Sequence, residues 1–241
     1  MDTPNGSPLS WQGEPIPFDA SIEELRERIR APGEAAWAAF RVLARRDSEE
    51  ALDVLVAATR YEDPFLRRGA VEALGLHPRG CTRGEAVAGR LRDSNEYVVR
   101  AACAAAGNLG LLDVHDEVRG LLGHAAVETR EAAVGALGAL WKADDFEAVF
   151  RLSRKDLSRE VREAAAWVLR AHSEADNWRV LFEAWRCDDM PRHRVWACEL
   201  AEAFGDEGVT PSLEQMLSDS DGHVRGAAGR ALAALRGTGS A

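Results

Sequence analysis

Apolar residues recur along most of the chain at helical spacing, in two alternating kinds of segment. The first kind carries large apolar residues at some or all of positions i, i+3, i+4 and i+7, as Leu52, Leu55 and Val56 do. This spacing favours a helix with one buried face. The second kind is rich in alanine. Helices of the first kind are expected at residues 48–60, 83–91, 113–122, 144–152, 175–186 and 208–218.

A short motif recurs at the start of the alanine-rich segments: in the clearest copies a capping residue, an apolar residue followed by arginine, then small residues on one face, with looser copies at Val99-Arg100 and His193-Arg194. In the clearest copy Val224 and Arg225 precede Ala227, Ala228 and Ala231. Successive copies begin 30 to 33 residues apart, a period that is typical of stacked two-helix repeats. The arginines that mark the copies are Arg67, Arg100, Arg130, Arg162, Arg194 and Arg225.

Local signals predict where these helices begin and end. Ser21, with Glu24 three residues later, has the spacing of a capping box. Asp63, Ser158 and Asp221 stand four residues before their arginines and are expected to cap the alanine-rich helices. Small core residues let such helices approach closely. Glycines expected to end them in a left-handed conformation are Gly75, Gly110, Gly138 and Gly205.

The pattern Asp-Pro-x-x-Val-Arg-x-Ala-Ala-x-x-Ala-Leu-Gly resembles HEAT repeats of the short bacterial type, named after phycobilisome lyases. The resemblance covers residues 20–236. It implies an all-α fold, a right-handed α-α superhelix (a HEAT-like solenoid) of about seven helix pairs, in which the second helices line a concave face. It also implies a structural ladder between repeats, formed by the six arginines together with Asp63, Asp156, Asp188, Asp219 and Asp221.

The two ends of the chain depart from the repeat. Residues 1–19 hold four prolines and cannot form a helix. We expect an extended N-terminal arm in which the segment from Trp11 to Phe18 packs on the first repeat; a binding arm for another chain is the alternative. The repeat array is expected over residues 20–236, followed by a flexible tail at residues 237–241.

Charge and leader signals narrow the classes of partner and location. The formal net charge of −10 argues against a nucleic-acid partner, because nucleic acids bind through positive surfaces. No signal peptide and no apolar run of about 18 residues is visible. We therefore expect a cytoplasmic protein without a membrane segment. Cys103 and Cys198 are expected in the core, and Cys81 and Cys187 in exposed connections.

The sequence shows no pattern that indicates a metal or cofactor. Cys187, Asp188, Asp189 and His193 cluster in a predicted turn, without a recognised metal-ligand spacing. No phosphate loop, serine elbow or Cys/His pair is present. No cofactor is expected, and the sequence favours a protein that is not an enzyme.

Three groups of HEAT-like proteins with known chemistry provide tests of the resemblance. No local signature of bilin lyases is visible. Deoxyhypusine hydroxylases carry repeated His-Glu metal ligands, whereas this chain offers only His115 with Asp116. Alkylpurine DNA glycosylases use a Trp and an Asp in a basic groove; the spacing of Trp141 and Asp145, and that of Trp185 and Asp189, is similar, but the acidic charge opposes this function.

The residues expected to face the concave groove lie at the first, fifth and eighth places after each arginine. Small residues such as Ala101, Ala105 and Gly135 then form its floor beside Trp167. We expect a non-enzymatic scaffold that binds a protein or peptide in this groove, and the acidic residues around it favour a basic partner. A chaperone or lyase-like protein that holds a small ligand there is the alternative. Oligomeric state is unknown. The expected contact residues are Trp167, Arg170, Glu131, Glu163, Glu199, Glu202, Arg68 and Arg230.

Overall fold

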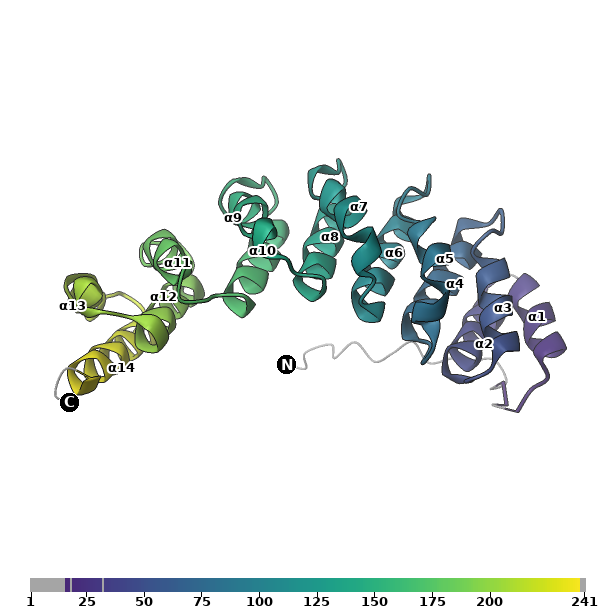
Figure 1. Cartoon of the computed structure of the whole chain (residues 1–241), viewed down its shortest axis with the longest axis horizontal. Helices are drawn as coiled ribbons and strands as arrows, with labels where there is room; N and C mark the ends of the chain where they lie inside the picture. Colours follow the sequence, from purple (N-terminus) through teal and green to yellow (C-terminus); the bar gives the residue numbers. More distant parts are fainter. Residues whose placement is uncertain (1–15, 18, 32, 239–241) are drawn as a thin grey trace, which may run out of the picture. The chain divides into compact units, whose positions relative to one another are not determined.

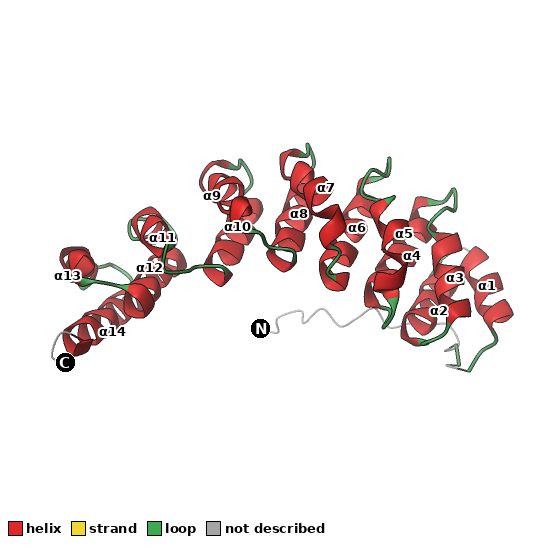
Figure 2. Ribbon diagram, in the orientation of Figure 1, coloured by secondary structure: helices red, strands yellow, loops and turns green. Residues whose placement is uncertain are grey.

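The computed structural model describes residues 16–17, 19–31 and 33–238, and every regular element among them is a helix. This confirms the all-α fold (Figure 2). The chain divides into two compact units, residues 1–145 and residues 146–241. Within the described residues, no helix combines the length and the apolar character that crossing a bilayer requires.

Residues 1–145 form four successive helix pairs (Figure 1). In each pair the second helix packs on the second helix of the next pair: α2 on α4, α4 on α6 and α6 on α8. Short 3-10 turns precede or follow several first helices. The pairs are α1 (Ile22–Arg30) with α2 (Glu34–Arg45), α3 (Glu49–Ala58) with α4 (Pro64–Leu76), α5 (Gly84–Ala88) with α6 (Glu96–Leu109), and α7 (His115–Gly120) with α8 (Val127–Ala139).

Residues 146–241 form three more pairs, so the described part of the chain holds the seven pairs that the sequence predicted. Here α9 packs on α10, α11 on α12, α12 on α14 and α13 on α14. We call α4, α6, α8, α10, α12 and α14 the inner helices. The pairs are α9 (Phe146–Lys155) with α10 (Arg159–Ala171), α11 (Trp178–Trp185) with α12 (Pro191–Phe204), and α13 (Thr210–Met216) with α14 (Gly222–Thr238).

The predicted helix starts are confirmed by hydrogen bonds from free amides to the capping side chains. Ser21 Oγ accepts from the Glu24 amide at 3.1 Å, and Ser158 Oγ accepts from the Val161 amide at 3.3 Å. Asp63 accepts from the Phe65 amide and Asp221 from the His223 amide, both at 2.8 Å. Each bond satisfies a donor that has no partner inside its helix.

The predicted helix ends are only partly confirmed. Gly110 follows α6 in a left-handed conformation with φ of 63°. Gly75 and Gly138 instead lie inside α4 and α8, and Gly205 is extended with φ of −64°. Gly75 has another role, because a Cβ there would meet the Cα of Ala105 at 2.8 Å. This glycine allows α4 and α6 to pack with their backbones in close approach.

The small residues form the core of the inner helices, as predicted. Ala70, Ala102, Ala133 and Ala165 have no exposed surface. Two residues expected to face the groove, Ala101 and Ala105, are buried as well. Ala105 is buried because it packs against Gly75 of α4. Fewer small residues of α6 are therefore exposed in the groove than the sequence spacing predicted.

The predicted arm and tail lie mostly outside the described residues. Trp11 and Phe18 belong to this undescribed part, so their packing stays a prediction. Ile16, which is described, is buried. At the other end α14 continues to Thr238, and residues 239–241 lie outside the described part.

Candidate partner-binding site

Arg67 joins its own repeat to the next one. Its Nε and Nη2 donate to the two carboxylate oxygens of Asp93 at 2.9 and 2.7 Å, and its Nη1 donates to the carbonyls of Tyr61 and Glu62. Burial alone would raise the pKa of Asp93, but the hydrogen bonds from Arg67 and from the Asn95 amide lower it below its usual value. We call such an Arg–Asp link between successive repeats a rung.

Arg194 forms a second rung with the same geometry. Its Nε and Nη2 each donate to Asp219 at 2.8 Å, and hydrogen bonds from Arg194 lower the pKa of Asp219. Arg130, Arg162 and Arg225 also donate through Nη1 to the carbonyls five and six residues earlier. Arg100 differs, because its guanidinium lies over the ring of Tyr97 at 5.6 Å.

The acidic partners in these two rungs are not all those named from the sequence. Asp63 and Asp221 cap their own helices. The carboxylate of Asp156 accepts from the Ser158 amide, and its carbonyl accepts from Arg162. Asp93, which the sequence reading missed, lies in the connection between α5 and α6 and carries the first rung. The sequence feature that could have identified Asp93 is its position 26 residues after Arg67, since Asp219 similarly follows Arg194 by 25 residues.

Between α10 and α12 the regular packing of inner helices is interrupted. The second place after the arginine is Gly69 or alanine in the other copies, but it is Trp196 in α12. The Trp196 side chain is buried and lies against Trp185 and His193, with ring centroids 5.7 and 5.2 Å apart. The backbones of α10 and α12 do not approach each other as those of α12 and α14 do (Figure 1). A large residue in a column of small ones accounts for this separation.

Trp167 of α10 packs on this buried tryptophan and stays half exposed. The two indoles meet edge-on with centroids 4.7 Å apart, and 50% of the Trp167 surface is accessible. The guanidinium of Arg192 lies 5.9 Å from the Trp167 ring, and that of Arg170 lies 5.4 Å from the Trp196 ring. The outer face of Trp167 is thus an apolar surface held in place from below.

Several of the charged residues predicted for the groove are already paired within the chain. Arg170 binds Glu199 at 2.6 Å between α10 and α12, and Glu163 binds Arg159 at 2.7 Å. Glu202 and Arg230 are exposed on α12 and α14. Two predicted residues belong to the other unit: Glu131 is exposed on α8, and Arg68 binds Glu72 at 2.6 Å and lies over Trp37.

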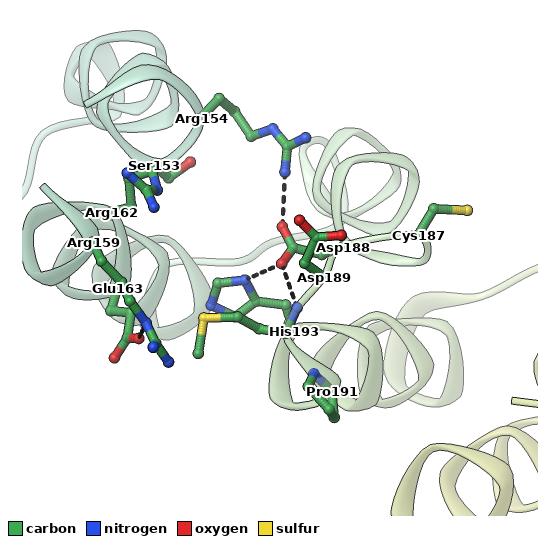
Figure 3. Close-up of a pocket in the computed structure, with 11 residues that line it drawn as sticks. Ser153, Arg154, Arg159, Arg162, Glu163, Cys187, Asp188, Asp189, Pro191 and His193 are labelled. Atoms are coloured by element: carbon green, nitrogen blue, oxygen red, sulfur yellow. Dashed lines mark hydrogen bonds and ion pairs between the residues drawn. The ribbon is translucent and has the colours of Figure 1, made fainter. Parts of the chain in front are cut away.

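A hollow of about 670 Å³ lies between the first turns of α10 and α12 (Figure 3). Arg154 and His193 both point toward Asp188, at 2.9 and 3.2 Å, while Arg159 and Arg162 line the α10 side. Burial lowers the pKa of His193, although Asp188 opposes this shift, so the site favours the neutral imidazole. Trp167 is not among the lining residues; Glu163, one turn before it, is.

A buried histidine in residues 1–145 forms a separate polar cluster, in which the sequence indicated the neighbours His115 and Asp116 but not Asp145. His115 lies between two carboxylates, with Nε2 2.8 Å from Asp145 and Nδ1 2.9 Å from Asp116. Asp145 also accepts from the Lys142 amide at 2.9 Å. In the described part of the chain no three His, Cys, Asp or Glu side chains form a group able to hold a metal. The cluster links α7 to the turn after α8, which indicates a structural role.

Residues 22–82 and 84–170 match the family described as HEAT repeats. No curated protein matches the chain. Among solved structures, the CpcE–CpcF complex of phycocyanin lyase from Nostoc sp. PCC7120 is similar over 95% of this chain and 99% of that one, with 20% identity and a TM-score of 0.56. A HEAT-like repeats protein from the archaeon Thermococcus onnurineus NA1 is similar over 90% and 97%, with 16% identity and a TM-score of 0.60. At these identities the likeness shows the fold alone.

Proposed function

Because the chain belongs to the HEAT repeat family, we propose that it is a non-enzymatic scaffold that binds a protein or peptide partner on its inner helices, with Trp167 as the central contact. Repeat folds present long surfaces built from successive helices, and such surfaces serve binding more often than chemistry. The family alone does not specify a partner. The proposal therefore rests on the surface of α10 and α12.

The observation that carries the proposal is the half-exposed indole of Trp167. Tryptophan and arginine are enriched among the residues that dominate binding energies, and they act best on a rigid support. Trp196 supplies that support from below, and the Arg170–Glu199 ion pair lies on the same two helices. The accessible face of Trp167 can bury apolar surface against a partner at little cost in side-chain entropy.

The charges beside Trp167 favour a partner of mixed character. Glu163 and Glu199 are neutralised by arginines of the same chain, so they attract a basic group less than the sequence suggested. Glu202 is exposed on α12, one turn beyond Glu199, and can pair with a basic side chain of the partner. A partner with basic groups near Glu202 and an apolar residue on Trp167 fits this surface.

The alternative, a lyase-like protein that encloses a small ligand around Trp167, has less support. Small-ligand sites bury most of the ligand in a cavity with converging polar groups. Half of the Trp167 surface is instead open to solvent. The neighbouring hollow is lined by Glu163 but not by the Trp167 indole.

The test is quantitative capture of interacting proteins with the full chain and two variants. Trp167→Ala should reduce recovery of the specific partner by at least about tenfold, the size of a hot-spot loss. Tyr97→Ala is the matched control, because Tyr97 is also an aromatic residue of an inner helix and is 49% exposed. Equal recovery by the wild type and Trp167→Ala, or equal losses in both variants, would overturn the assignment of this surface.

A further inference from the structure

One rung of the ladder is open. Asp188 lies 26 residues after Arg162, the separation that joins Arg67 to Asp93. Asp188 accepts from the Met190 amide at 3.0 Å, just as Asp93 accepts from the Asn95 amide, so it occupies the equivalent place in its connection. Its carboxylate nevertheless pairs with Arg154 and approaches His193, rather than meeting Arg162.

Arg162 uses only the two N–H donors of Nη1 and leaves the three on Nε and Nη2 without an acceptor in the described part of the chain. Its Nη1 donates to the carbonyls of Asp156 and Leu157 at 2.7 and 3.2 Å, as in the closed rungs. Among the residues that the structure describes, none accepts from Nε or Nη2, the two nitrogens that bind the carboxylate in the other rungs. These donors belong to a side chain that lines the hollow of about 670 Å³.

A second group at the hollow, the imidazole of His193, faces Asp188 without a well-formed hydrogen bond. His193 is buried to all but 5% of its surface and lines the hollow. Its Nδ1 lies 3.2 Å from Asp188, but within the described structure it makes no hydrogen bond of acceptable geometry. A buried polar atom without a partner is costly, and such atoms are usually satisfied by a bound molecule when the protein does not satisfy them.

The cause of the open rung is the wide spacing of α10 and α12. Trp196 stands between these helices where the other copies have glycine or alanine, and Trp167 packs against it. The resulting separation moves Asp188 away from Arg162. The other two arginines of the hollow have carboxylate partners, Asp188 for Arg154 and Glu163 for Arg159. Of the three arginines that line this hollow, Arg162 is therefore the one without a carboxylate partner among the described residues.

We propose that the open rung is a binding site for a carboxylate group of the partner, which takes the place at Arg162 that an aspartate of the chain holds in the closed rungs. A side-chain or terminal carboxylate presents two coplanar oxygens to the guanidinium edge, the geometry seen at Asp93 and Asp219. His193 Nδ1 provides a second polar contact. The exposed carboxylate of Asp189 makes a dianion such as phosphate less favourable than a singly charged carboxylate.

This inference rests on the proposed function, because it assigns the carboxylate to the protein or peptide partner proposed above. The site lies one turn from Trp167 along α10, since Glu163 both lines the hollow and precedes Trp167 by four residues. A partner segment that covers Trp167 can therefore place an acidic residue in the open rung. A free carboxylic acid has the same chemistry and is the other possible source.

The experiment follows the arginine Nε–Hε resonances of the ¹⁵N-labelled full chain by NMR, assigned with Arg162→Ala and Arg225→Ala. Arg225 is the matched control, because its Nη1 makes the same two carbonyl bonds at 2.7 and 3.0 Å. The probes are acetyl-Asp-Glu-Asp-Glu-amide, its Asn-Gln-Asn-Gln counterpart, sodium acetate and inorganic phosphate, each at an ionic strength matched with sodium chloride.

The proposal predicts a saturable shift of the Arg162 resonance with the acidic peptide and with acetate, while the Arg225 resonance does not move. Binding of the peptide at least about tenfold tighter than acetate assigns the site to a peptide partner; similar affinities assign it to a free acid. No saturable shift at Arg162, equal shifts at Arg225, equal shifts with the Asn-Gln peptide, or a response to phosphate alone would overturn it. If the Arg162 resonance does not shift, the partner-capture result for Trp167→Ala is unaffected. The two proposals can therefore fail separately.

Discussion

Trp196 lies edge-on beneath Trp167, with ring centroids 4.7 Å apart, at the place where the other inner helices carry glycine or alanine. One bulky residue in a column of small ones has three connected results. We infer that it separates α10 from α12, supports the half-exposed Trp167 and keeps Asp188, which pairs with Arg154, from Arg162. The candidate binding surface thus arises from a local departure from the repeat.

The closed rung between Arg67 and Asp93 should contribute strongly to stability. The two side chains are 12% and 3% exposed, so replacing Asp93 by alanine leaves the Arg67 guanidinium poorly solvated and without its carboxylate. We expect Asp93→Ala to lower the free energy of unfolding in urea by about 2–4 kcal/mol. Glu72→Ala is the control, because it breaks the half-exposed pair with Arg68 and should cost at most about 0.5 kcal/mol. Similar losses for both variants would contradict the role of the rung.

The same rungs make stability depend on pH in the acid range. The pKa values of Asp93 and Asp219 are lowered in the folded state, so each carboxylate stabilises the fold fully above its unfolded pKa of about 4. This contribution is lost as the pH falls through the lowered folded-state pKa. The difference in unfolding free energy between the wild type and Asp93→Asn should therefore be constant from about pH 6 to 7 and narrow below about pH 4. A difference that grows on acidification would contradict this sign.

Two glycines of the inner helices should respond in opposite directions to the same substitution. Gly75→Ala places a Cβ 2.8 Å from the Ala105 backbone, so α4 and α6 must move apart, and we expect a loss of about 2–3 kcal/mol. A Cβ on Gly135 of α8 would meet no described atom within 4 Å, and Gly135→Ala should stabilise by about 0.5–1 kcal/mol through helix propensity. Thermal unfolding of both variants tests the pair, and destabilisation by Gly135→Ala would refute the open environment assigned to it.

The four cysteines should separate into two classes by reactivity. Cys103 and Cys198 are buried, and burial raises the pKa of each thiol to about 12. Cys81 and Cys187 are exposed. Because the thiolate is the reactive form, alkylation of the native chain at about pH 8 should modify the two exposed residues and spare the two buried ones. Rapid labelling of Cys103 or Cys198 without denaturant would contradict the core described for α6 and α12.

The repeat of arginine every 30 to 33 residues was sufficient to predict the helix pairs and most of the core, because each copy repeats the same local chemistry. The rungs were harder to predict. Asp93 lies in a connection 26 residues after Arg67, and that separation has meaning only once the packing of successive pairs is known. From the sequence, Asp63 was expected to have two roles, as a helix cap and as a member of the ladder; the structure shows the capping bond, while Arg67 donates to Asp93.

The candidate site was predictable in part. Trp167 was found from its place after Arg162, and its exposure agrees with that reading. Its contact with Trp196 was not foreseen, although a tryptophan in a column otherwise filled by glycine and alanine was visible in the sequence. The pairing of Glu163 and Glu199 with arginines also needed the structure, because side-chain partners on neighbouring helices depend on the distance between them.

In our interpretation, Trp196 holds the rung between Arg162 and Asp188 open. Double-mutant cycles on unfolding free energy test it directly, with the closed rung of Arg194 and Asp219 as reference. We predict a coupling of about 1–3 kcal/mol for Arg194 with Asp219, and close to zero for Arg162 with Asp188 in the wild type. In the Trp196→Ala background the Arg162–Asp188 coupling should rise above about 1 kcal/mol as the helices close. A wild-type coupling equal to that of the reference rung, or no rise in Trp196→Ala, would contradict the account.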